Sequence, residues 1–175
     1  MVLAAGPFAD NGNGAMTDTG TGLIWLKNAN CTDTVVGVAK SDGYLSWNDA
    51  AMWSNGLSSG ACSLSDGSHA GDWRLPTLDE LKSLICRPGA PAWVYNGCDG
   101  SNTTNPNGLY PFQWLMSQGF SAVQDNDYWS SSTYPGYPDY ARSVRMVNFY
   151  VNFGSKGDGS YVWPVRGGQW GDSVI

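Results

Sequence analysis

The sequence predicts one α+β domain over residues 1–175, with two short helices packed on small antiparallel β-sheets, many loops, and disulfide bonds that staple them. Three observations predict this class. The chain has 175 residues, enough for one domain to bury its own core. It contains 23 glycines, 9 tryptophans and 9 tyrosines, a composition typical of short strands and turns packed around large rings. Helical periodicity is confined to two short segments.

The N-terminal part predicts two strands and then a helix. The strands cover residues 15–17 and 23–26, and the run at residues 10–14, DNGNG, predicts a tight Asn-Gly hairpin before them. The first helix follows Ser46, an N-cap residue with Asp49 at the third helical position. Gly56, followed by Leu57, predicts a left-handed C-cap at its end.

A buried strand at residues 73–75 leads directly into the second helix. Pro76 ends the strand, and Thr77 with Glu80 three residues later predicts a capping box. The helix runs from Leu78 to about Ile85. Its apolar residues repeat at helical spacing, which predicts one buried face: Leu78, Leu81, Leu84 and Ile85.

The C-terminal half predicts a long excursion and four further strands. Residues 87–107 are rich in Pro, Gly and Asn, which is typical of a loop. Short alternating segments predict strands at residues 128–131, 141–146, 149–153 and 161–166. The last three of these predict an antiparallel meander.

Charge and hydropathy exclude two classes of partner. Charged residues make up 14% of the chain and the net charge is −6, so no excess of Lys or Arg is present to displace the counterions of a nucleic acid. No apolar run reaches the roughly 20 residues that a membrane-spanning helix needs. The sequence therefore predicts no nucleic-acid partner and no membrane insertion, and it predicts no particular oligomeric state.

Four cysteines predict disulfides rather than a metal site. They are not spaced as metal-binding pairs, and the single histidine, His69, cannot complete a Cys₂His₂ zinc site. An even cysteine count is typical of oxidised secreted domains. Three pairings are open on this basis for Cys31, Cys62, Cys86 and Cys98.

Five separate pieces of the chain, in the same order, resemble a known bacterial family. This family is the domain found at the C-terminus of the Legionella collagen-like adhesin and in many secreted proteins, and the resemblance covers nearly the whole chain. The pieces are DNGNG at 10–14 with Thr17 and Asp18, TGLIWLKNANC at 21–31, GDWRLPT at 71–77, YWSS at 128–131 and YVWPVRGG at 161–168.

The resemblance implies a variant of the C-type-lectin fold. It implies sequential disulfides, Cys31–Cys62 at the ends of the first helical segment and Cys86–Cys98 around the Pro/Gly-rich loop. Arg74 and Arg166 lie in apolar strands and are expected to form internal ion pairs, with Asp72, Asp79 and Glu80 as the near carboxylates. The family's framework tryptophans are expected in the core: Trp25, Trp73, Trp129 and Trp163.

The sequence predicts no enzyme, no cofactor and no metal site. Residues 74–77 and 166–168 are also similar to formylglycine-generating enzymes, but no cysteine follows Cys98, so the catalytic residues of those enzymes are missing. His69 lies in a turn without a nucleophile elbow and is expected to be an exposed loop residue. The run at 10–14 lacks the alternating ligands and final Glu of an EF-hand. Calcium stays possible because C-type-lectin folds often use it, although the sugar-binding triplets of animal lectins are absent.

A hairpin over residues 133–156 has the composition of a binding surface. Tyr gives broad contact at low entropic cost, and Asn, Asp and Arg give adaptable hydrogen bonds. The framework of this hairpin is set by Ala141, Val144, Val147, Val151 and Phe153. The alternative is an ordinary solvated antiparallel hairpin with β-forming tyrosines. The predicted ligand-binding residues are Tyr134, Tyr137, Asp139, Tyr140, Arg142, Ser143, Arg145, Asn148, Tyr150 and Asn152.

These features predict a secreted or surface-displayed bacterial adhesion module, located outside the cell, on its surface or in the periplasm. The expected partner is a glycan or a host or cell-surface protein. The family resemblance also implies sulfated polysaccharides as a ligand class, but this acidic chain offers only Arg142, Arg145 and Lys156 as a local basic group. Two alternatives remain: a retroelement-diversified or phage-like receptor binder with a protein ligand, and a structural accessory domain of the cell surface.

Overall fold

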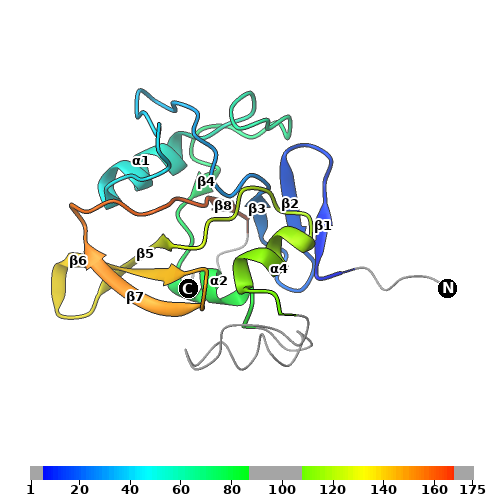
Figure 1. Cartoon of the computed structure of the whole chain (residues 1–175). Coiled ribbons are helices and arrows are strands. Elements are labelled where there is room, and N and C mark those ends of the chain that lie inside the picture. The colour runs from blue at the N-terminus through cyan, green and yellow to red at the C-terminus, as the bar shows by residue number, and fades with distance from the viewer. Residues whose placement is uncertain (1–5, 87–107, 168–175) are drawn as a thin grey trace, which may run out of the picture.

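The computed structural model describes residues 6–86 and 108–167. Three helices and eight strands fall within these ranges (Figure 1). The helices are α1 (Trp47–Gly56), α2 (Leu78–Ser83) and α4 (Pro111–Ser117). The strands are β1 (Phe8–Asp10), β2 (Ala15–Asp18), β3 (Ile24–Leu26), β4 (Trp73–Arg74), β5 (Asp127–Tyr134), β6 (Tyr137–Arg145), β7 (Tyr150–Ser155) and β8 (Val165–Arg166). None of the described helices is long and apolar enough to cross a bilayer.

The strands form two antiparallel sheets that confirm the α+β class. The larger sheet has the order β1-β2-β3-β8-β4, and the smaller has the order β5-β6-β7. In Figure 1 the smaller sheet lies on the side of the molecule away from the β1–β2 hairpin. The Asn-Gly run at 10–14 does connect β1 to β2, with Gly12 and Gly14 at positive φ, as a tight hairpin requires.

The predicted meander of the last three strands is wrong by one strand. The meander is β5-β6-β7, and β8 leaves it to pair between β3 and β4 in the other sheet. Two features direct the chain toward the larger sheet: Tyr161 forms a parallel β-bridge with Tyr128, and the side chain of Trp163 is buried in the core. Only Val165 and Arg166 are then left to complete the larger sheet.

The helix caps are confirmed with one exception. Ser46 caps α1, and Thr77 forms the predicted capping box with Glu80 at the start of α2. Gly56 is not a left-handed cap, because it lies inside α1 and Leu57 ends the helix in an extended conformation. Helix α4 was not predicted from the sequence, since it has only seven residues and includes Phe112 and Trp114, whose helix propensity is modest.

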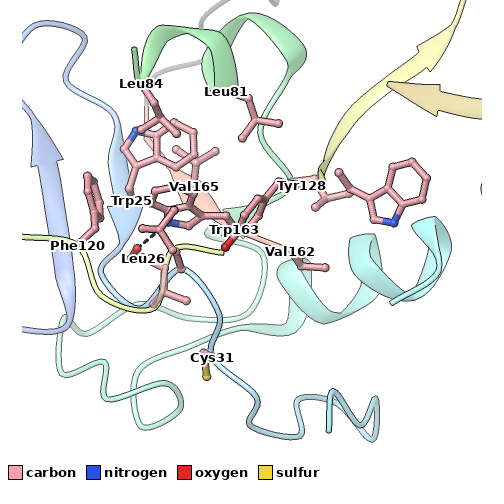
Figure 2. Packing of buried hydrophobic residues seen from close by; sticks show 14 of the residues in the cluster. Trp25, Leu26, Cys31, Leu81, Leu84, Phe120, Tyr128, Val162, Trp163 and Val165 are labelled. Atoms are coloured by element: carbon pink, nitrogen blue, oxygen red, sulfur yellow. Dashed lines mark hydrogen bonds between the residues drawn. The ribbon is translucent and has the colours of Figure 1, made fainter. Parts of the chain in front are cut away.

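The core is built around Trp163. Its indole ring contacts the rings of Trp25 at 5.5 Å and Phe120 at 5.0 Å, and its Nε1 donates to the carbonyl of Leu26 at 2.8 Å (Figure 2). Figure 2 shows Leu81 and Leu84 of the α2 segment closing over this group. All four framework tryptophans are buried, as predicted: Trp25, Trp73, Trp129 and Trp163.

The two strand arginines form the expected internal ion pairs, but with only one expected partner. Arg74 makes a bidentate contact with Glu80, at 2.7 and 2.8 Å. Arg166 lies 3.4 Å from Asp66, a carboxylate that was not among the predicted partners. Asp66 was missed because it precedes Trp73 by seven residues and reaches Arg166 only through the pairing of β4 with β8.

The disulfide Cys31–Cys62 is present and joins the segment before α1 to the loop after it. Cys86 is also disulfide-bonded, and its predicted partner, Cys98, lies outside the described residues. The first bond closes a segment with a sequence separation of 31, which contains all of α1.

We expect the double variant Cys31→Ser, Cys62→Ser to lose about 3 kcal/mol of unfolding free energy, because the unfolded chain is no longer constrained by this bond. Urea unfolding followed by tryptophan fluorescence measures the loss. Ser65→Ala, an exposed site just after the same loop, is the control and should change stability by under about 0.5 kcal/mol. A double variant as stable as the control would contradict the expectation.

Candidate ligand-binding surface

The predicted binding hairpin is β6 and the strands on either side of it, and the body of the protein holds it firmly. Three hydrogen bonds anchor β5: the Nε1 of Trp47 donates to the carbonyl of Ser130 (2.8 Å), the backbone N–H of Ser131 to the carbonyl of Pro76 (2.8 Å), and the backbone N–H of Leu78 to the hydroxyl of Ser132 (3.2 Å). These bonds tie β5 to α1 and to the start of α2. The surface is therefore carried on a fixed sheet rather than on a loose loop.

The register of β6 with β7 divides the predicted residues between two faces of the sheet. Arg142 lies opposite Phe153, Ser143 opposite Asn152, and Arg145 opposite Tyr150. Directly opposed residues share a face and successive residues alternate, so Arg142 faces one way and Ser143 and Arg145 face the other. The predicted set therefore cannot act as a single site.

On the first face, four aromatic side chains line a cleft of about 370 Å³. We call this the aromatic cleft; its residues are Tyr134, Tyr137, Tyr140 and Phe153. Tyr137 is 60% exposed, Tyr140 38% and Phe153 51%. Large apolar rings grouped on a surface are characteristic of interaction sites, whereas single exposed rings need no explanation. The cleft is therefore the candidate ligand-binding site among the described residues.

Phe153 was misassigned by the sequence analysis, which placed it in the hairpin framework. Its alternation with Val151 does place both side chains on one face, but β7 extends beyond the edge of the core. Val151 is half-buried at the inner end of that face, while Phe153 at the outer end is exposed and contacts Tyr134 at 4.6 Å. The residue pattern of this strand does not indicate at which residue it leaves the core.

Arg142 stands at the side of the cleft. Its guanidinium carbon lies 4.7 Å from the ring centroid of Tyr134, the geometry of a cation–π contact. The side chain is half-buried. One positive charge therefore lies next to a ring of the cleft, although Arg142 is not part of the cleft lining.

On the opposite face, Asp127 accepts hydrogen bonds from three polar residues of the hairpin. Its carboxylate accepts from Arg145 at 2.8 Å and from Ser143 and Asn152, each at 3.5 Å. This hydrogen bond and ion pair raise the pKa of Arg145 above its usual value. Ser143 is buried. These three predicted residues are bonded to one another through Asp127 and stabilise the sheet.

The remaining predicted residues lie outside the cleft. The side chain of Asn148 accepts from the backbone N–H of Tyr150 at 3.0 Å and so fixes the turn before β7. Tyr150 is 51% exposed, on the Asp127 face. Asp139 is exposed, and its backbone carbonyl accepts a hydrogen bond from the backbone N–H of Lys156 at 2.8 Å.

Two other features have side chains of the kinds found in catalytic or metal sites. His69 is exposed, as predicted, and its Nδ1 lies 3.8 Å from Asp72. Among residues 6–86 and 108–167, the one grouping of metal-ligating side chains is Cys31, Asp33 and Cys62. Both cysteine sulfurs of that group are consumed by the disulfide, so its donor set does not suit a metal ion.

Comparison with known proteins identifies one family. The model of the family described as the Lcl C-terminal domain matches residues 14–166, a range that includes the Cys31–Cys62 disulfide, the aromatic cleft and every strand of the two sheets except β1. No curated protein matches the chain.

Proposed function

The chain belongs to the Lcl C-terminal domain family, and from this we propose that it is a secreted or surface-displayed bacterial adhesion module that recognises a carbohydrate or cell-surface ligand without catalysis. Membership of an adhesin family gives the general role. The disulfides support a location outside the cytoplasm, because such bonds persist in oxidising compartments. A net charge of −6 argues against nucleic acid as the partner.

The observation that carries the proposal is the aromatic cleft. Aromatic rings bury a large area with little loss of side-chain entropy, and they are enriched at recognition sites. Tyr137 and Tyr140 are presented on a strand that β5 and β7 hold on both sides. We place the ligand on this face rather than on the Asp127 face, where Arg145 already has an ionic partner at 2.8 Å.

Binding at the cleft is proposed to need neither a metal ion nor chemistry by the protein. Calcium prefers several carboxylate and carbonyl oxygens, whereas the cleft is lined by four aromatic side chains. Such a lining offers surfaces for stacking and lacks the paired nucleophile and base of a hydrolytic site. Ligand binding is accordingly expected to be unchanged when calcium is removed with a chelator.

The test is a glycan array that includes sulfated polysaccharides, probed with the oxidised protein in the presence and absence of calcium. A panel of cell-surface proteins is screened in parallel. We expect the double variant Tyr137→Ala, Tyr140→Ala to weaken binding at least about tenfold, since two exposed rings of the cleft are lost.

Tyr150→Ala is the matched control, because it removes an equally exposed tyrosine from the opposite face. It should bind as the parent protein does. Equal losses in the control and in the double variant would move the site away from the cleft. An absence of binding on the array and on the protein panel would favour a structural role at the cell surface.

A protein ligand and a diversified binding surface form the second candidate, favoured by the exposure of tyrosines on both faces of an anchored sheet. A retroelement that mutates adenines would change Tyr, Asn, Asp and Ser codons along this hairpin. This reading predicts that sister copies in one genome differ at Tyr137, Tyr140, Ser143, Asn148 and Tyr150, while Trp129 and Trp163 stay fixed. Differences spread evenly along the chain would exclude it.

A further inference from the structure

The four rings of the aromatic cleft form a closed circuit, each ring contacting two others. The centroid distances are 5.6 Å for Tyr134–Tyr137, 6.2 Å for Tyr137–Tyr140, 6.2 Å for Tyr140–Phe153 and 4.6 Å for Phe153–Tyr134. The Tyr137 and Tyr140 rings lie at 81° to one another and those of Tyr140 and Phe153 at 63°. The rings thus surround a hollow instead of forming one flat platform.

An aromatic box of this kind attracts cations, because the ring faces are electron-rich. One such contact is present in the protein, because the guanidinium carbon of Arg142 lies 4.7 Å from the ring centroid of Tyr134. The net charge of −6 adds a general attraction for a cationic group. No lysine lines the cleft.

The cleft has few partners for the many hydroxyl groups of a neutral sugar. Ser143 and Asn152 face away from it and are bonded to Asp127. The side chain of Asn148 is used by the backbone of Tyr150. The polar groups of the lining residues are the tyrosine hydroxyls, and the guanidinium of Arg142 lies next to the Tyr134 ring. This set suits an apolar cation attached to an anion.

We propose that the aromatic cleft binds a quaternary ammonium group carried next to a phosphate, as in a phosphocholine headgroup. The trimethylammonium lies among the four rings, and the phosphate faces Arg142, whose planar guanidinium matches phosphate oxygens. This inference rests on the proposed function, for which it names the chemistry of the ligand.

Isothermal titration of the protein with phosphocholine, choline and phosphoethanolamine tests the inference. We expect phosphocholine to bind about tenfold more tightly than phosphoethanolamine, whose ammonium lacks the methyl groups. Tyr140→Ala and Phe153→Ala each remove one side of the box and should weaken phosphocholine about tenfold or more. Arg142→Gln should abolish the preference for phosphocholine over choline while choline binding is kept. Tyr150→Ala, on the opposite face, should leave all three affinities unchanged.

Absence of binding up to about 10 mM phosphocholine, or binding that survives both Tyr140→Ala and Phe153→Ala, overturns the inference. If an array glycan or surface protein still binds through Tyr137 and Tyr140, the proposed function stands without it. Sedimentation with phosphatidylcholine vesicles and capture on phosphocholine-coupled albumin separate the two sources of the group. Competition by phosphocholine in the first assay assigns a lipid headgroup, and capture in the second alone assigns a headgroup displayed on another carrier.

Discussion

Glu80→Ala is expected to lower the unfolding free energy by about 4 kcal/mol. The carboxylate is fully buried, and it makes both an ion pair and a helix-capping hydrogen bond, which the substitution removes together. Its oxygens accept from the guanidinium of Arg74 at 2.7 and 2.8 Å, and one of them also accepts from the backbone N–H of Thr77 at 2.8 Å. Loss of one partner of a buried ion pair costs about 3 kcal/mol or more, and loss of the cap adds about 1 kcal/mol.

The ion pair has this large effect because of its place in the fold. Arg74 lies in β4, the edge of the larger sheet, and Glu80 lies in α2, whose next turn covers Trp163. The ion pair therefore links the edge of the larger sheet to α2, between two residues that are six positions apart in the chain. Without the carboxylate, the half-buried guanidinium is left without its bidentate acceptor and the start of α2 loses its capping box.

Asp79→Ala is the matched control for this prediction. It removes an exposed acid from the same first turn and so has the same effect on the helix dipole, without touching the ion pair. We expect it to cost under about 1 kcal/mol, and Glu80→Gln to fall between the two variants. Chemical unfolding measures all three. Equal losses for Asp79→Ala and Glu80→Ala would show that the ion pair contributes little.

Local features of this fold were predictable from the sequence, and pairings between distant segments were not. Ser46, Thr77 and Glu80 act within one helical turn, so their spacing was enough to place two helix starts. The position of β8 depends on Trp163 entering a core formed by residues far away in the chain. The disulfide pairing came from the family resemblance, since spacing alone left three possibilities.

The hairpin over residues 133–156 shows the same division. Its composition predicted a recognition surface there. Composition could not reveal that Ser143 and Arg145 turn toward Asp127 while Arg142 turns toward the aromatic cleft, because that depends on register. A slip of one residue would exchange the two faces. Phe153 was missed for a related reason, since its exposure depends on how far β7 projects beyond the core.

Lys40 is a buried charge that the sequence analysis did not identify. It is 1% exposed, and its Nζ donates to the carbonyls of Cys31 at 2.8 Å and Val162 at 3.2 Å. The same atom lies 4.3 Å from the ring centroid of Trp53 in α1. These neighbours favour a cation but carry no net charge, and burial lowers the pKa of Lys40 to about 7. The side chain thus bridges three segments near the disulfide.

The lowered pKa predicts that stability rises with pH in a defined window. Above about pH 7 the folded protein has released the Lys40 proton, while the unfolded chain retains it up to its ordinary pKa of 10.5. The unfolded state then binds more protons, so unfolding becomes harder as pH increases, and below pH 7 this group contributes no dependence. The full window corresponds to roughly 4 to 5 kcal/mol, of which about 3 kcal/mol is gained by pH 9.5.

Urea unfolding at pH 7, about 8.5 and about 9.5, with Lys40→Met as the comparison, measures this dependence. The variant should show a flat profile, because Met has a similar length and no proton to release. The pH series ends at about 9.5 because the hydrogen bond with Tyr44 and burial raise the pKa of Tyr161 to about 12. A raised tyrosine pKa removes stability above about pH 10, which opposes the lysine effect. Parallel profiles for the two proteins between pH 7 and 9.5 would mean that the ammonium of Lys40 stays protonated in the fold, held by its two carbonyls and the Trp53 ring.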